Sequence, residues 1–341
     1  MDKASAEHLE AIRRAARRIG RPVTLMEVCG THTVSIFRSG IRTLLPDSVR
    51  LVSGPGCPVC VTAQRDIDAA IELAERDDVV VTTYGDMVRV PGRRGSLETK
   101  RAEGADVRVV GSIRSALETA RNAPDKQVVF IAVGFETTAP ATAAAIREAK
   151  RLGIDNFSVL AAHKLVVPAM TALLEDEDVP LQGFLCPGHV SVIIGAEAYR
   201  PVVEDYRIPC VVAGFEPCNI LSGLARLMRQ IERGECLLEN AYGIAVTPQG
   251  NVVAQRLLDE VFEVVDAPWR ALGTIPRSGL ALRPSYRPFD ARERFGITIG
   301  ADEDYPACRC GEVIQGKVNP PECSLFATAC TGALGARASR G

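Results

Sequence analysis

The sequence predicts an α/β protein with two βαβ lobes, whose parallel sheets flank a central cleft, followed by a small cysteine-rich C-terminal region. Three observations support this fold class. From about residue 49, short β-branched runs alternate with amphipathic segments of helical length, which is the pattern of βαβ units. After about residue 266 the periodicity is lost and prolines interrupt the chain. The last forty residues then contain four cysteines.

The elements expected along the chain begin with a helix over residues 4–19, stopped by Gly20 and Pro22. Its arginine-rich face could dock a partner, but we expect it to be solvated. The expected strands are 49–52, 79–83, 107–110, 128–133, 157–161, 183–185 and 210–213. The clearest expected helices are 62–76, 112–121 and 139–151. The segments expected as domains are 1–48 with the N-terminal helix and a Cys-Gly-Thr-His run, 49–124 as the first lobe, 125–265 as the second lobe, and 266–341 as the C-terminal region.

Composition narrows the class of protein. With 341 residues, 47% of them hydrophobic and 24% charged, the chain has enough apolar material for two or three domains, which excludes a largely disordered protein. Forty Lys and Arg against 42 Asp and Glu give a net charge of −2, so no nucleic acid or membrane partner is expected. Because no secretory signal or long apolar run is seen, we expect a cytoplasmic protein. Its eleven cysteines then suggest metal or redox chemistry.

The cysteines near the C-terminus have the spacing of a metal centre. They are Cys308, Cys310, Cys323 and Cys330. Four thiolates suit either an iron–sulfur cluster or zinc, and the uneven spacing without Cys-x-x-Cys pairs favours a [4Fe–4S] cluster. The region has little apolar content of its own, so a metal would have to hold it together.

A second cysteine group lies near the other end of the chain. Cys57 and Cys60 form a Cys-x-x-Cys pair between an expected strand and an expected helix, where the helix dipole favours a thiolate. Cys29 and His32 add a sulfur and an imidazole on a similar glycine turn. Three interpretations remain open for this group, namely a structural zinc site, a redox dithiol and a site for a substrate metal.

Polar residues follow two of the expected strands. Glu136, Thr137 and Thr138 come after 128–133, and the segment with His189 and Ser191 comes after 183–185. Thr138 and Ser191 are expected to cap the helices that follow, and a helix cap or a turn histidine explains each motif taken singly. Since ligands bind at the carboxyl ends of parallel strands, two such motifs favour a binding cleft.

Together these motifs resemble one family, the HypD proteins of [NiFe]-hydrogenase maturation. The resemblance rests on Cys29-Gly30-Thr31-His32, Gly54-Pro55-Gly56-Cys57-Pro58-Val59-Cys60, Gly134-Phe135-Glu136-Thr137-Thr138-Ala139-Pro140, Pro187-Gly188-His189-Val190-Ser191 and the four tail cysteines, in this order. It extends from about Cys29 to Cys330. It implies two α/β lobes around a cleft and a third region with a [4Fe–4S] cluster.

The resemblance also implies a function. The family assembles the Fe(CN)₂CO group of the hydrogenase active site, with Fe(II) carrying cyanide and carbon monoxide as transient cargo. The implied partners are the small chaperone HypC, the cyanide donor HypE and, indirectly, the hydrogenase large subunit. The chain would then be an assembly scaffold with redox-active thiols rather than an independent turnover enzyme. A stand-alone thiol and iron–sulfur oxidoreductase and a zinc-stabilised binding module are the alternatives.

Roles for individual residues follow from the same resemblance. Cys29 would hold the iron together with the chaperone, and Cys57 and Cys60 would be a redox-active pair close to it. The residues expected to orient the incoming group or move protons are His32, Glu136, Thr137, Thr138, His189 and Ser191. The family's usual Ser-Glu-Gly-Ala-Cys-like run after Cys330 has no counterpart here, so three expectations stand: ligation by the four tail cysteines, weak cluster binding, or no cluster.

Overall fold

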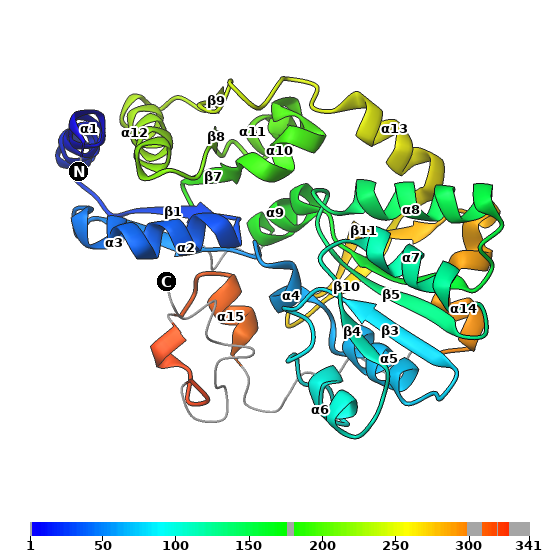
Figure 1. The fold of residues 1–341 in the computed structure, drawn as a ribbon. Helices are drawn as coiled ribbons and strands as arrows, with labels where there is room; N and C mark the ends of the chain where they lie inside the picture. Colours follow the sequence, from blue (N-terminus) through cyan, green and yellow to red (C-terminus); the bar gives the residue numbers. More distant parts are fainter. Residues whose placement is uncertain (1, 176–180, 299–308, 319, 327–341) are drawn as a thin grey trace. The chain divides into compact units, whose positions relative to one another are not determined.

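The computed structural model describes residues 2–175, 181–298, 309–318 and 320–326 (Figure 1). It divides into two compact units, each assembled from separate stretches of the chain. Unit 1 consists of Met1–Cys57, Val166–Val252 and Ala307–Gly341. Unit 2 consists of Pro58–Leu165 and Val253–Pro306.

Unit 1 is built on a five-stranded parallel sheet in the order β2-β1-β7-β8-β9. Its strands are β1 (Val23–Glu27), β2 (Val49–Ser53), β7 (Gly183–Pro187), β8 (Cys210–Ala213) and β9 (Leu238–Asn240). β2, β7 and β8 confirm three of the expected strands. β1 and β9 were not expected, because their sequences, Val-Thr-Leu-Met-Glu and Leu-Glu-Asn, contain no long run of β-branched residues.

The helices of unit 1 are α1 (Lys3–Ile19), α2 (Gly30–Ser39), α3 (Ile41–Leu44), α9 (Val166–Leu174), α10 (Gly188–Ile194), η1 (Ala196–Tyr199), α11 (Arg200–Glu204), α12 (Pro217–Arg233), α15 (Cys310–Ile314) and η3 (Pro320–Glu322). α1 confirms the expected N-terminal helix. The Asp2 side chain caps its start by accepting from Ser5 N–H, and Gly20 ends it in the left-handed conformation. Its apolar face packs with α12 over the sheet, in a core that includes Ile12 and Leu224.

Unit 2 contains a four-stranded parallel sheet in the order β4-β3-β5-β6. Its strands are β3 (Val79–Thr83), β4 (Val107–Val109), β5 (Gln127–Gly134) and β6 (Phe157–His163), all close to the expected ranges. Its helices are α4 (Pro58–Val61), α5 (Gln64–Ala74), α6 (Leu97–Ala102), α7 (Ile113–Asn122), α8 (Ala139–Leu152), α13 (Val252–Val261), η2 (Pro284–Phe289) and α14 (Ala291–Phe295). The alanine-rich faces of α7 and α8 share a core with β5 and β6.

A two-stranded antiparallel hairpin completes unit 2. It pairs β10 (Phe262–Trp269) with β11 (Gly273–Leu282). The sequence led us to expect no regular structure from residue 266 onward, and in this stretch that expectation is wrong. Pro268 and Pro276 obscured the strands, yet a two-stranded ribbon has open edges at which a missing N–H group is tolerated.

The two units do not coincide with the segments expected as domains. Strand pairing crosses residue 124, because β3 and β4 join β5 and β6 in one sheet. β2, in contrast, pairs with β1 and belongs to unit 1. The residues after β9 return to unit 2 through α13 and the hairpin. Changes in composition along a chain reflect only the local sequence, whereas the compact units of a fold are determined by which strands pair.

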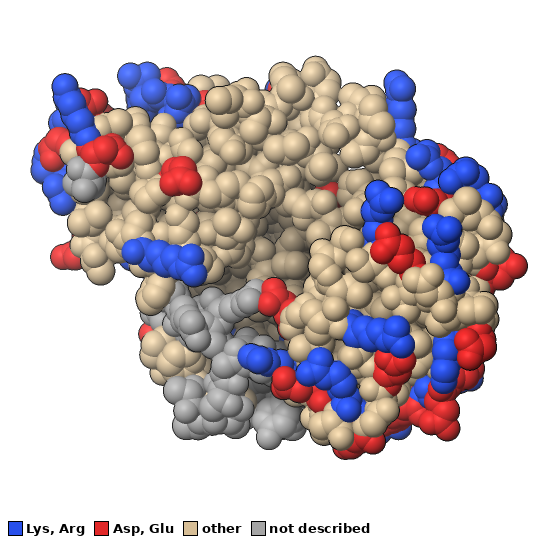
Figure 2. Space-filling model, viewed as in Figure 1, with Lys and Arg blue, Asp and Glu red and all other residues tan. Residues whose placement is uncertain are grey.

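The surface carries charges of both signs, in agreement with the small net charge of the sequence (Figure 2). On the face shown in Figure 2, Lys and Arg side chains stand beside Asp and Glu at the left edge and over the right side, and the middle is largely uncharged. Arg13, Arg14, Arg17 and Arg18 on α1 are exposed, as expected for a solvated face. Within the described ranges, no helix is both long enough and apolar enough to span a bilayer.

Candidate functional site

Cys29 and Cys57 are presented by two neighbouring loops at the carboxyl edge of the unit 1 sheet. β1 leads to Cys29, which occupies the N-cap position of α2, and β2 leads through a Gly-Pro-Gly turn to Cys57. Since β1 and β2 are adjacent and parallel, both loops leave the sheet on the same side. The Gly30 N–H donates to Gly56 O at 2.9 Å, and the Gly54 N–H donates to Glu27 O at 2.7 Å. The two cysteine loops are thus hydrogen-bonded to each other.

Glycine is required where these loops touch. A Cβ added to Gly56 would overlap the backbone N and Cα atoms of Cys29. A Cβ added to Gly30 would lie 3.8 Å from the Cys57 Cβ. This contact places the backbones of Cys29 and Cys57 side by side, which brings two residues 28 positions apart in the sequence into one site.

The Cys29 thiol is nearly buried. Burial raises its pKa to about 11, and the negative charge of Glu27 acts in the same direction, while the N–H groups of Thr31 and His32 oppose the shift. In the apo protein the sulfur is therefore a protonated thiol at neutral pH, and a metal ion must displace that proton to bind it.

Glu27, the last residue of β1, lies within hydrogen-bonding reach of this loop. Burial raises its pKa to about 7, although hydrogen bonds from Ser53, Thr33 and the Cys29 N–H act against that shift. The Cys29 N–H donates to its Oε2 atom at 2.9 Å. The sequence analysis did not single out Glu27, because an acidic residue at a strand end is ordinarily solvated.

His32 is fully buried in the first turn of α2. Its Nε2–H donates to Gly214 O at 2.9 Å, and its Nδ1 atom has no hydrogen-bond partner among the described residues. Burial lowers its pKa to about 4, so the ring is neutral at physiological pH and Nδ1 carries a lone pair. The neutral ring can accept a proton or a hydrogen bond at Nδ1.

An aromatic group extends from His32 across the next strands. Phe215, which follows β8, stacks on the exposed ring of His189 with centroids 3.8 Å apart, and its centroid lies 4.9 Å from that of His32. Tyr242 meets Phe215 edge-on at 6.3 Å. The structure therefore brings the two expected histidines of unit 1 together through Phe215, which the sequence analysis did not select.

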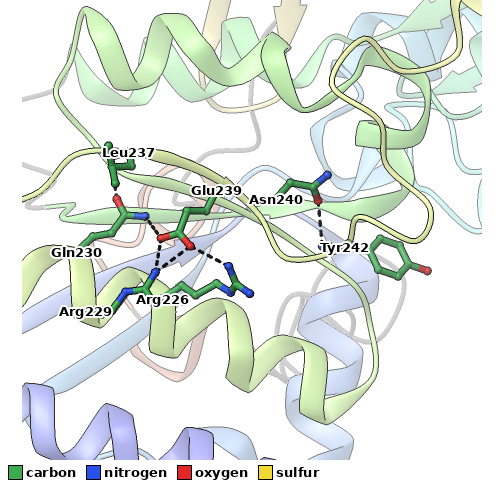
Figure 3. A network of polar contacts seen from close by, with 7 residues as sticks. All are labelled: Arg226, Arg229, Gln230, Leu237, Glu239, Asn240 and Tyr242. Atoms are coloured by element: carbon green, nitrogen blue, oxygen red, sulfur yellow. Dashed lines mark hydrogen bonds and ion pairs between the residues drawn. The ribbon is translucent and has the colours of Figure 1, made fainter.

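The position of Tyr242 is fixed by a polar network around β9 (Figure 3). Glu239 accepts hydrogen bonds from Arg226, Arg229 and Gln230 of α12. The next residue, Asn240, accepts from the Tyr242 N–H at 2.9 Å. The Tyr242 ring consequently lies so close to Gly188 and Gly214 that a Cβ on either glycine would approach it within 2.9 Å.

Ser191 does not cap a helix, so that expectation is wrong. α10 begins at Gly188, and Ser191 lies one turn inside it, fully buried. Its hydroxyl donates to Pro187 O at 2.7 Å and also bonds the Tyr199 hydroxyl at 3.0 Å. The Ser191 hydroxyl thereby stabilises the first turn of α10, the helix that carries His189.

Cys60 lies in unit 2, in the short helix α4 that follows Cys57 directly. The β10–β11 hairpin supports this helix. Thr62 forms a β-bridge with Trp269, and the Arg270 N–H donates to Val61 O at 2.9 Å. The Trp269 indole is itself fixed by a 2.7 Å hydrogen bond to Ser278.

Glu136, Thr137 and Thr138 follow β5 in unit 2, as expected. Glu136 is buried and Thr137 is exposed. Thr138 occupies the N-cap position of α8, as predicted, but its side chain makes no capping hydrogen bond and its hydroxyl donates to Phe135 O at 3.3 Å. Gly134 is needed here because a Cβ would overlap the Thr138 hydroxyl.

Two of the four tail cysteines, Cys308 and Cys330, lie outside the described residues. The other two are grouped around Arg309, which precedes Cys310 at the start of α15. Its guanidinium donates to Glu322 O at 3.4 Å and is close enough to the Cys323 sulfur to interact electrostatically with it. Ile314 is the one buried hydrophobic residue among those the structure describes in residues 309–318 and 320–326. Cysteine thiolates are the donors that an iron–sulfur cluster takes, so the chemistry of Cys310 and Cys323 is compatible with such a group.

Within the described ranges, no three or more His, Cys, Asp and Glu side chains are arranged so as to hold a metal ion.

Comparison with known proteins gives the family. A family model described as "HypD: Hydrogenase formation hypA family" matches residues 3–336. The chain is 44% identical over 334 residues to the hydrogenase maturation factor HypD of Cupriavidus necator, which covers 96% of this chain and 88% of that protein. This chain belongs to the HypD family.

Other members of the HypD family are equally similar. The hydrogenase maturation factor HypD of Escherichia coli (strain K12) is 44% identical over 311 residues, covering 91% of this chain and 83% of that protein. The one of Azotobacter vinelandii is 45% identical over 337 residues, covering 97% and 89%. Membership of the HypD family makes this chain a hydrogenase maturation factor, and the resemblance seen in its motifs is confirmed.

Proposed function

We propose that this protein is the scaffold on which the Fe(CN)₂CO group of a [NiFe] hydrogenase is assembled, with ferrous iron held as cargo by Cys29 and the Cys57–Cys60 pair. The observation that carries the proposal is the direct contact between the Cys29 and Cys57 loops at one edge of the sheet. Thiolates are suitable ligands for iron, and a site with few protein ligands leaves coordination positions for cyanide and carbon monoxide.

The Cys57–Cys60 dithiol supplies the electrons that the release of cyanide requires. Reductive release of cyanide from an S-cyanated cysteine breaks its S–CN bond and consumes two electrons and one proton, giving a thiol and cyanide, which binds the iron. Oxidation of Cys57 and Cys60 to a disulfide supplies the two electrons and two protons, of which one protonates the departing thiol. Because a disulfide no longer offers thiolate ligands, Cys29 and the chaperone would hold the iron until the pair is reduced. Two cyanides therefore require the pair to be reduced again by an external one-electron donor.

The remaining site residues have supporting roles in this proposal. Neutral His32 would orient the incoming group by accepting a hydrogen bond at Nδ1, and His189 and Phe215 form the wall beside it. Glu136, Thr137 and Thr138, which follow β5, would orient the incoming group. A [4Fe–4S] cluster bound by Cys308, Cys310, Cys323 and Cys330 would supply single electrons. The chaperone HypC would complete the iron coordination at Cys29, and HypE would donate the cyanide.

The test is infrared spectroscopy of the anaerobically purified complex with the chaperone. We expect bands of iron-bound cyanide and carbon monoxide in the wild type and their loss in Cys29→Ala. Cys60→Ser is expected to lack the cyanide bands. Cys236→Ser is the matched control, because it removes a half-buried thiol that bonds only Val203 O among the contacts described, and it should keep every band.

Two results would contradict the proposal. Unchanged infrared bands in Cys29→Ala would show that the iron is not bound at this site. Disulfide turnover at Cys57 and Cys60 that is independent of Cys29, without any infrared bands in the wild type, would instead indicate a stand-alone oxidoreductase.

A further inference from the structure

The buried carboxylate of Glu27 takes no part in the chemistry proposed above. Its side chain is 1% exposed, although it carries an ionisable group at the edge of a sheet. Enclosing a carboxylate is strongly unfavourable unless neighbouring groups hydrogen-bond to it, so a buried carboxylate is informative about the groups that surround it. Its contacts involve both of the loops that carry sulfur.

Both carboxylate oxygens bond to the Cys29 segment. Oε2 accepts from the Cys29 N–H at 2.9 Å, and Oε1 accepts from the Thr33 hydroxyl at 2.5 Å. Cys29 is the N-cap of α2 and Thr33 lies one turn inside the helix. The carboxylate therefore fixes where α2 begins, and with it the backbone from which the Cys29 thiol projects.

The same residue also bonds to the end of β2, which leads to Cys57. Its backbone O accepts from the Gly54 N–H at 2.7 Å, and its carboxylate accepts a hydrogen bond from the Ser53 side chain. Arg42 donates to the Ser53 hydroxyl at 2.9 Å and places a positive charge beside this group. Glu27 is thus bonded to the Cys29 loop and to the residues just before the Cys57 loop.

We propose that Glu27 is a positioning residue that holds the Cys29 and Cys57 loops in the register at which both sulfurs reach one metal ion. This inference rests on the proposed iron site. Metal–sulfur bonds of about 2.3 Å leave little freedom in the separation of two sulfurs on one metal, and a site that is loose by about 1 Å loses its function. Glu27 acts through its hydrogen bonds and does not itself touch the metal.

The hydrogen bonds distinguish a conservative substitution from a disruptive one. Glu27→Gln can keep both contacts, because its Oε1 can accept from the Cys29 N–H while its amide donates to the Thr33 hydroxyl. That hydroxyl can then donate to Cys29 O, which lies 3.3 Å away. Glu27→Ala leaves the Cys29 N–H without its acceptor and opens space beneath the loop.

Co²⁺ serves as an air-stable probe in place of ferrous iron. Thiolate-to-cobalt charge-transfer absorption is titrated with the full-length protein, and the part of the signal absent from Cys29→Ala is assigned to this site. We expect Glu27→Ala to weaken that Cys29-dependent binding at least about 10-fold, and Glu27→Gln to stay within about 3-fold of the wild type. Thr33→Val should fall between them, and Thr43→Val, which removes an exposed hydroxyl bonded to Gly40 O, should have no effect.

The outcomes of the cobalt titration distinguish the proposed iron site from the positioning role of Glu27. A wild type with no Cys29-dependent signal overturns the proposed iron site itself. A clear wild-type signal that is equal in Glu27→Ala overturns only the positioning role, as does an equal loss in the Gln and Ala variants. If circular dichroism shows that Glu27→Ala does not fold, Thr33→Val decides, and affinity equal to that of Thr43→Val contradicts the inference.

Discussion

At the scale of single residues, burial sets the protonation states of two buried histidines, His32 and His163, and of Cys29. Cys29 and His32 share the first turn of α2, yet burial raises the pKa of the thiol to about 11 and lowers that of the imidazole to about 4. Both shifts favour the neutral form, because a charge in a poorly solvated site is unfavourable. At neutral pH the Cys29 thiol is therefore protonated and the His32 imidazole is uncharged.

His163, at the end of β6, allows this argument to be tested through stability. Burial lowers its pKa to about 3, with a smaller contribution from Lys164, while in the unfolded chain it is near 6.5. The unfolded state therefore binds more protons between these values, so stability falls as the pH falls from about 6.5 towards 3. One such histidine removes about 2 kcal/mol between pH 7 and pH 5.

We expect His163→Gln to reduce this acid sensitivity, as measured by urea midpoints at pH 7 and pH 5. Thr43→Val, which removes an exposed hydroxyl and no titratable group, should leave the pH dependence as it is in the wild type. Equal slopes in His163→Gln and the wild type would show that His163 is protonated in the folded protein.

At the scale of elements, unit 2 is held together by a buried charge group as well as by its apolar core. Asp66, in the first turn of α5, accepts from Arg292 of α14 at 2.6 Å and lies 3.7 Å from the Lys164 ammonium. Asp66 and Lys164 are both buried. A carboxylate placed between two cations joins three segments that are far apart in the sequence.

We expect Asp66→Asn to destabilise the protein by about 3 kcal/mol, because it leaves Lys164 and Arg292 with uncompensated charge in a largely buried position. Asp106→Asn is the matched control, since its ion pair with Arg108 is exposed and should contribute little. Chemical denaturation of the three proteins measures the difference, and equal midpoints for both variants would contradict the structural role of Asp66.

At the scale of the whole molecule, the chain passes from one unit to the other and back more than once. The core of unit 2 joins Phe130 of β5 and Phe157 of β6 with Phe262 and Leu282 of the hairpin, which lie beyond all of unit 1's strands in the sequence. Each such side chain stabilises by about 1.5–3 kcal/mol when buried, so several of them together equal the net stability of a typical domain of about 5–15 kcal/mol. Neither unit can be complete before most of the chain has been synthesised.

We therefore expect residues 58–165 expressed alone to lack a cooperative thermal transition. Co-expression with residues 253–306 should give a complex that purifies together and melts cooperatively, because the hairpin and α14 restore the core. A sharp transition for 58–165 by itself would mean that the hairpin is dispensable for this unit.

The sequence by itself determined the α/β class, most of the parallel strands and the cysteine motifs. These follow from local periodicity and from spacing, which are properties of neighbouring residues. The family was also recognisable from the motifs alone. Only the tertiary structure decided that β1 lies beside β2, so that Cys29 and Cys57 adjoin, and that Glu27 is buried between their loops. It also decided that Phe215 joins two histidines and that a proline-containing hairpin supports Cys60. Strand order and burial arise from contacts between distant segments, and such contacts leave no periodic signal in the residues that make them.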